Sequence, residues 1–108
     1  MSTLEQSSLS LEYVLVKVAS KQSGAWVDIT ADTVQMAFPV AGVTPVAGDW
    51  KAATWETDTE TDPDTYYARC LVGPGGTVTL TAQLYDVYVK VTDSPEIPTI
   101  RAGQLRVF

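Results

Sequence analysis

Apolar residues recur at every second position through much of this chain, and this period of two constrains its fold more than any other feature. The segment 84–92 reads LYDVYVKVT, in which Tyr85 and three alternating valines would lie on one face. The other face would carry Asp86, Tyr88 and Lys90. Because the side chains of a strand point alternately to its two sides, the pattern predicts a strand with one face in a core.

Similar segments follow one another along the chain, separated by turns rich in Gly, Pro or acidic residues. They are 9–18, 33–38, 50–56, 65–72, 77–80, 84–92 and 99–108. Helical spacing is not evident, so we predict an all-β fold, a β-sandwich of about seven antiparallel strands with no substantial helix. Both phases of segment 9–18, LSLEYVLVKV, are apolar. That strand is expected to be buried on both sides or to switch faces midway.

The glycine-rich sequence GPGG, at 73–76, lies between two of these segments. A phosphate-binding loop joins a strand to a helix, because the amides at the helix N-terminus bind the anion. Here the β-branched sequence TVTL follows the glycines, and no Lys-Ser or Lys-Thr pair is present after them. The segment is therefore predicted to be a turn, in which Gly adopts positive φ and Pro74 restricts the backbone.

Tyr85 stands five residues after Leu80, which ends the preceding predicted strand. This spacing resembles the tyrosine corner of immunoglobulin-like domains, in which the hydroxyl bonds to the upstream backbone. An ordinary core tyrosine could show the same spacing. Together with the strand pattern, the corner favours a single immunoglobulin-like β-sandwich domain over residues 9–108. Residues 1–8 would form an extended N-terminal arm, either frayed or ordered on a neighbouring molecule.

Length and charge narrow the possible functions. A chain of 108 residues corresponds to one domain. Its net charge of −6, from 13 acidic and 7 basic residues, argues against binding to a nucleic-acid backbone. It has no His, which is the commonest general base and metal ligand. No stretch has the character of a signal peptide or a membrane span, so we expect synthesis in a cytoplasm and no membrane association.

The best candidates for chemistry are the acidic residues of ETDTETDPD, which alternate with Thr or Pro: Glu56, Asp58, Glu60, Asp62 and Asp64. A calcium loop needs a Gly at its turn and a terminal Glu, and neither is correctly placed. A solvated loop of mutually repelling charges is favoured over a cation site or a glycosidase acid pair. Cys70 lies in a strand and is expected to be a buried apolar residue. We expect no enzyme activity, cofactor or metal.

The aromatic residues suggest a binding surface and not a catalytic site. Trp50 and Trp55 are five apart, so on one strand they would point to opposite faces. Lys51 shares the phase of Trp55, which predicts Trp50 inward and Trp55 outward. In an immunoglobulin-like order this strand would share a sheet with those of Tyr88 and Phe108. The candidate protein interface on that outer face is Trp55, Tyr88, Arg106 and Phe108. Scattered surface aromatics are an equally weighted alternative.

A longer series of motifs carries a family resemblance. DTVQMAFP, GDWKAATWE, YYARC and LVGPGGTVTLTAQLYDVYVKVTDSPEIPTIRAGQLRV follow in this order. The series resembles small immunoglobulin-like virion structural proteins of tailed bacteriophages of actinobacterial hosts, whose sandwich is similar to the N-terminal domain of a phage baseplate upper protein. The resemblance covers roughly residues 13–108 and departs from the expected Pro-Gly-type turn at Ala82 and Gln83. It implies no catalytic residues.

The resemblance implies a structural component of a tailed-phage virion, associated with the head or neck as a capsid decoration protein or in the head-to-tail connector region. It would bind capsid or connector subunits, as a homo-oligomer or in many copies on a symmetric assembly, after synthesis in the host cytoplasm. The alternative is a tail or baseplate module that recognises host surface glycans at a concave site with aromatics beside carboxylates, for instance Trp55 near the acidic loop. Neither hypothesis involves nucleic acid.

Overall fold

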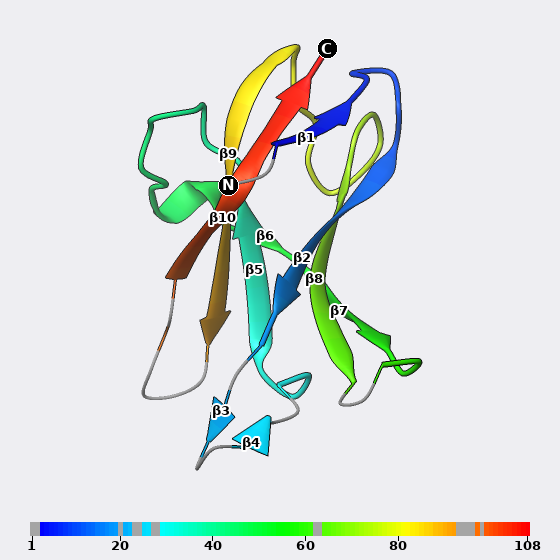
Figure 1. Ribbon diagram of the computed structural model, residues 1–108. Coiled ribbons are helices and arrows are strands. Elements are labelled where there is room, and N and C mark those ends of the chain that lie inside the picture. Colours follow the sequence, from blue (N-terminus) through cyan, green and yellow to red (C-terminus); the bar gives the residue numbers. More distant parts are fainter. Residues whose placement is uncertain are drawn as a thin grey trace.

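The computed structural model in Figure 1 describes residues 3–19, 21–22, 25–26, 29–61, 64–92, 97 and 99–108. In this part, the chain forms ten strands and one short 3-10 helix, η1. The strands are β1 Thr3–Gln6, β2 Glu12–Val18, β3 Lys21–Gln22, β4 Ala25–Trp26, β5 Thr33–Ala37, β6 Lys51–Ala52, β7 Thr54–Asp58, β8 Thr65–Val72, β9 Gln83–Thr92 and β10 Thr99–Val107, and η1 is Ala47–Asp49.

Two sheets form the layers of the molecule. One has five strands in the order β1-β10-β9-β5-β6, and the other has three in the order β2-β8-β7, while β3 and β4 pair as a separate two-stranded antiparallel sheet (Figure 1). This arrangement confirms the predicted all-β sandwich. One pairing departs from the antiparallel prediction, because β1 runs parallel to β10. Residues 3–6 of the predicted N-terminal arm thus lie within the five-stranded sheet.

The core lies between the sheets and follows the alternation in the sequence. Met36 of β5 and Val89 of β9 are fully buried, and Leu105 of β10 is nearly so. On β2, however, only the valine phase is buried. Neither predicted alternative for segment 9–18 is seen. Its valine phase faces the core from Val14 to Val18, so the strand does not switch faces, and no described strand or loop covers the second face of the three-stranded sheet over Tyr13.

The GPGG segment is a turn, as its sequence indicates. Gly73 has a φ of +137° and Gly75 a φ of +79°, a region that residues with a Cβ rarely adopt. The Gly73 N–H donates to the Val78 carbonyl over 2.8 Å. A Cβ on Gly73 would collide with the Ser10 carbonyl. The strand predicted at 77–80 is not formed, since Val78 contributes only an isolated bridge to Val72.

Tyr85 forms the hydrogen bonds that define a tyrosine corner. Its hydroxyl donates to the Thr81 carbonyl over 3.0 Å and accepts from the Thr81 N–H over 3.1 Å. The Gln83 side-chain amide donates to the same hydroxyl over 3.1 Å. The ring itself is buried. The turn before β9 is therefore fixed by the side chain of the strand that follows it, even though Ala82 replaces the expected turn residues.

Candidate interaction surfaces

Three of the four predicted interface residues lie on the outer face of the five-stranded sheet. Tyr88 of β9 is half-buried and stands opposite Arg101 of β10. Arg106 is exposed, and Phe108, just beyond the end of β10, is 63% exposed. The alternation in β10 places Leu105 on the opposite, core-facing side. The strand pattern predicted this part of the surface.

Trp55 does not belong to that face, so the predicted grouping was wrong. It lies on β7 in the other sheet, opposite the buried Ala68, and packs against the core. Its indole N–H donates to the Asp32 carbonyl over 2.8 Å. The reason is a change of sheet within WKAATWE: β6 pairs with β5, and the next strand, β7, pairs with β8. Ala53 lies at this crossing, and its N–H still donates to the Val34 carbonyl.

Trp50 takes the place on the outer face that was predicted for Trp55. The ammonium of Lys90 lies 4.4 Å from the centre of the Trp50 ring, a cation–π contact. Lys90 alternates with Val89 and Val91, which are buried in the core, so its side chain belongs to the outer face. The prediction that Trp50 points inward was therefore wrong, because Trp50 and Trp55 do not lie on one regular strand.

Asp86 is unusual on this outer face because its carboxylate is buried. Its neighbours on β9, Tyr85 and Val87, face the core, so the side chain of Asp86 points to the outer face. One oxygen accepts from the Gly42 N–H over 2.9 Å. The other accepts from Arg101 over 2.9 Å and from the Gln104 amide over 3.3 Å. The hydrogen bond from Gly42 is the main cause that lowers the pKa of Asp86, with Arg101 and Gln104 adding to it and burial opposing it. The carboxylate therefore stays ionised and holds the loop 39–50 against the sheet.

The outer face of the three-stranded sheet carries a second surface, which was not predicted from the sequence. We call Leu11, Tyr13 and Leu15 the β2 stripe. These side chains are 49%, 49% and 40% exposed, and Leu9 just before them is 88% exposed. In the sequence, these residues form the second apolar phase of segment 9–18. Such a phase is equally compatible with a buried face and with an exposed apolar surface.

Charged residues flank the β2 stripe on the same face. The guanidinium of Arg69 lies 4.5 Å from the centre of the Tyr13 ring. It also forms an ion pair of 3.3 Å with Glu56 on β7. An apolar stripe bordered by an arginine–aromatic contact has the composition of a protein-binding patch.

Of the candidates for chemistry that the structure describes, Asp58 has a local structural role. Asp58 ends β7 and accepts from the Glu60 N–H over 3.0 Å, so it stabilises the turn that follows. Asp62 lies outside the described residues. Among the residues that the structure describes, no group of three carboxylate or Cys side chains could hold a metal ion. Burial raises the pKa of the Cys70 thiol to about 11, so it stays protonated at neutral pH.

Comparisons with known proteins identify no relative of this chain. No family model, no curated protein and no solved structure matches the chain. In the described part of the chain, no helix is long and apolar enough to span a bilayer. The surfaces described above are thus the features from which a function can be argued.

Proposed function

We propose that this protein acts by binding other proteins through the outer faces of its sandwich, as a structural component of a tailed-phage virion at the head or neck. The observation that carries the proposal is the β2 stripe. Three large apolar side chains in a row are exposed on the face of a sheet whose opposite side already fills the core. Contiguous exposed apolar surface of this kind is typical of interaction sites.

The virion context rests on the motif series that resembles phage immunoglobulin-like structural proteins. The sandwich and the tyrosine corner at Tyr85 support that context. A small domain with one modest patch binds weakly as a single copy. Many copies on a symmetric shell would gain avidity, as a decoration or connector protein requires. The net charge of −6 would also keep the protein away from packaged nucleic acid.

The glycan hypothesis named Trp55 beside the acidic loop as an example of a sugar-stacking ring. The Trp55 indole packs against the core and its N–H is bonded to Asp32, so this example receives no support. Sugar-binding sites commonly stack a ring against an exposed aromatic face. We therefore propose protein binding, with subunits of the capsid or connector as partners.

A capsid co-sedimentation experiment tests the proposal. Purified protein is mixed with tail-free capsids of an actinobacterial tailed phage whose own copy of this protein has been removed, and bound protein is measured after sedimentation. Wild type should sediment with the capsids. The double variant Leu11→Ser/Tyr13→Ala should lose at least about tenfold in affinity, because it removes the centre of the apolar patch.

Val46→Ser is the matched control. Val46 is also an exposed apolar residue, but it lies on the loop 39–50 of the other sheet. Circular dichroism should show that all variants stay folded. A third variant, Tyr88→Ala, tests the face predicted from sequence. If the double variant sediments as wild type does, the β2 stripe is not the binding surface and the proposal fails.

A further inference from the structure

β2 is the outermost strand of the three-stranded sheet, and it pairs only with β8 among the described strands. Its register with β8 runs without interruption from Glu12 to Val18, and the strand contains neither Gly nor Pro. Natural proteins commonly interrupt a long edge strand with a bulge or a Pro, because its unpaired backbone groups can take up another strand. The free edge of β2 is therefore a candidate site for strand addition.

The hydrogen bonds of β8 show which residues of β2 face this edge. The Leu71 carbonyl accepts from the Val78 N–H over 3.2 Å, on the side of β8 away from β2. Because backbone groups alternate in direction along a strand, those of Val72 point toward β2 and its partner Glu12. The groups of Glu12 therefore point to β8, and those of every second residue after it point to the free edge. The residues with free-edge groups are Tyr13, Leu15 and Lys17.

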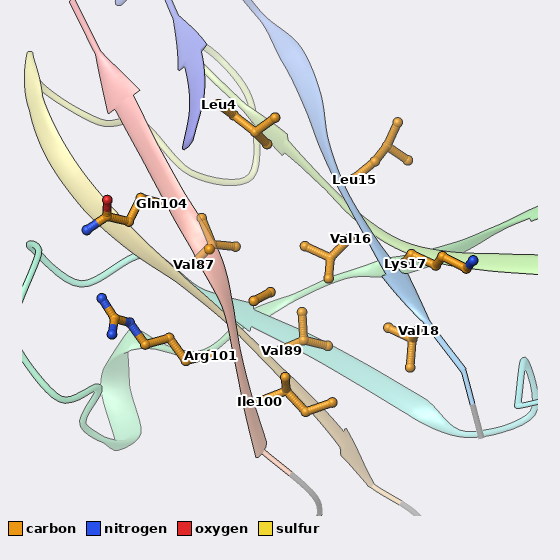
Figure 2. Close-up of a pocket in the computed structure, with 12 residues that line it drawn as sticks. Leu4, Leu15, Val16, Lys17, Val18, Val87, Val89, Ile100, Arg101 and Gln104 are labelled. Atoms are coloured by element: carbon orange, nitrogen blue, oxygen red, sulfur yellow. The ribbon is translucent and has the colours of Figure 1, made fainter. Parts of the chain in front are cut away.

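The side of the sandwich at this edge is mostly apolar. A cavity of about 390 Å³ opens between the two sheets there, with Val16 of β2 in its lining. Figure 2 shows the side chain of Val16 directed toward the five-stranded sheet, and those of Leu15 and Lys17 on the opposite side of β2. Leu4 and Ile100, which also line the cavity, are 43% and 46% exposed. A neighbour joined at β2 would cover part of this apolar surface.

The sequence of β2 is suited to pairing with a second copy of itself. An antiparallel pair that includes the whole of β2 from both copies is centred on Leu15, the middle residue of the strand. In this register no charged side chain faces a like charge, and Lys17 faces a tyrosine ring, with which a cation interacts favourably. The facing pairs across the two copies are Leu15 with Leu15, Val14 with Val16, Tyr13 with Lys17 and Glu12 with Val18.

The other edge of the same sheet does not have this property. It is formed by β7, whose middle residue is Glu56. An antiparallel pair of two β7 strands centred in the same way would place Glu56 opposite Glu56 of the second copy. Like charges directly opposite each other destabilise a strand pair. Charge complementarity thus favours a second copy at β2 and disfavours one at β7.

We propose that two copies of this protein associate by antiparallel pairing of their β2 strands about a two-fold axis at Leu15. Tyr13, Leu15 and Lys17 of each copy would donate and accept backbone hydrogen bonds across the axis. The two three-stranded sheets would join into one, and the two β2 stripes would form one apolar surface on its outer face. The inference goes beyond the proposed function, since the backbone edge of β2 binds a second copy whereas the side chains of the stripe bind the capsid or connector.

Sedimentation equilibrium of the purified protein over a wide range of concentrations tests the association. The average mass of wild type should rise from that of the 11.7 kDa monomer toward twice this value. Lys17→Pro removes an N–H at the free edge and should raise the dissociation constant at least about tenfold, because the two-fold axis removes that hydrogen bond twice. An edge strand tolerates Pro where its nitrogen faces outward, so circular dichroism should show a folded variant. A wild type that stays monomeric at every concentration would overturn the proposal.

Thr57→Pro is the matched control on the other edge of the sheet. Thr57 follows Glu56, which pairs with Tyr67 on β8, so by the same alternation the Thr57 N–H points away from β8. This variant should associate as wild type does. Equal association of both proline variants would show that the backbone of β2 is not the contact.

Leu11→Ser separates this inference from the proposed function. Leu11 belongs to the β2 stripe but precedes the paired residues 12–18, so the variant should weaken capsid binding and leave self-association unchanged. Loss of self-association in Leu11→Ser would indicate contact between the faces of two stripes and contradict edge pairing. A wild type that self-associates but does not sediment with capsids would contradict the proposed function alone.

Discussion

Among the described residues, each sheet of the sandwich has one arginine–carboxylate pair on its outer face, and the two pairs differ in their surroundings. On the five-stranded sheet, Asp86 and Arg101 are 2.9 Å apart and the carboxylate side chain is 2% exposed. On the three-stranded sheet, Glu56 and Arg69 are 3.3 Å apart and the carboxylate side chain is 45% exposed. The two ion pairs thus have the same chemistry, but the carboxylate is enclosed on the five-stranded sheet and exposed to solvent on the three-stranded sheet.

The difference comes from the loop 39–50. It crosses the outer face of the five-stranded sheet, and its Gly42 N–H is bonded to the carboxylate of Asp86. The Pro39 carbonyl accepts from the Asp86 N–H over 2.9 Å, so both the backbone and the side chain of Asp86 hold the loop. No described segment crosses the other sheet in this way over Tyr13. The chain itself covers the first face over Asp86, whereas the second face stays exposed over Tyr13.

The strongest test of this comparison removes one carboxylate at a time. Asp86→Ala should lower the free energy of unfolding by about 2 kcal/mol, because Gly42, Arg101 and Gln104 all lose the carboxylate that accepts their hydrogen bonds. Glu56→Ala should cost less than about 0.5 kcal/mol, as solvent screens an exposed pair. Urea unfolding followed by tryptophan fluorescence measures both. Equal losses would show that the loop does not enclose Asp86 in solution.

The pH dependence of stability tests the same group by titration. Because the pKa of Asp86 in the folded protein lies below its ordinary value of 3.8, the ionised form stabilises the fold. That contribution is fully present above the ordinary value and is lost as the pH falls through the lower folded value. Wild type and Asp86→Asn should therefore differ by a constant free energy near neutral pH, and the difference should shrink below about pH 4.

Urea titrations of both proteins at a series of pH values measure this difference. The other carboxylates titrate in both proteins and largely cancel. Glu56→Gln is the control on the exposed face and should show little change of the difference over the same range. A gap between wild type and Asp86→Asn that stays constant into acid would contradict the role assigned to the charge.

A smaller effect is expected from the tyrosine corner. Tyr85→Phe removes only the hydroxyl that bonds to both backbone groups of Thr81, and it should lower the free energy of unfolding by about 1 kcal/mol. Tyr13→Phe, on the exposed β2 stripe, should leave stability within about 0.5 kcal/mol of wild type. Thermal unfolding by circular dichroism compares the two. A larger loss for Tyr13→Phe would mean that its hydroxyl has a structural role.

The sequence was sufficient for those features that depend on neighbours along the chain. Alternation in 84–92 and 99–108 correctly placed Val89 and Leu105 in the core, and Tyr88 and Arg106 on the outer face. The spacing of Tyr85 from the preceding turn predicted a hydrogen bond that is local, spanning four residues. Such features do not depend on how distant segments pack, because the geometry of a strand fixes them.

Which side of each strand meets another layer was decided by tertiary structure. Alternation says that Trp50 and Trp55 differ in orientation, but the crossing between sheets at Ala53 determines that Trp55 is the one against the core. Two apolar phases in segment 9–18 are compatible with burial of either, and only the packing of the sheets leaves Tyr13 outside. A sequence period sets the relation between residues on one strand, whereas burial depends on contacts between distant segments.

The sequence by itself thus determined that this chain forms strands with two distinct faces, because the backbone imposes a repeat of two residues. Only the tertiary structure determined that the loop 39–50 covers Asp86 and that the β2 stripe stays exposed. These outcomes depend on where segments far apart in the chain meet, and no local pattern encodes that.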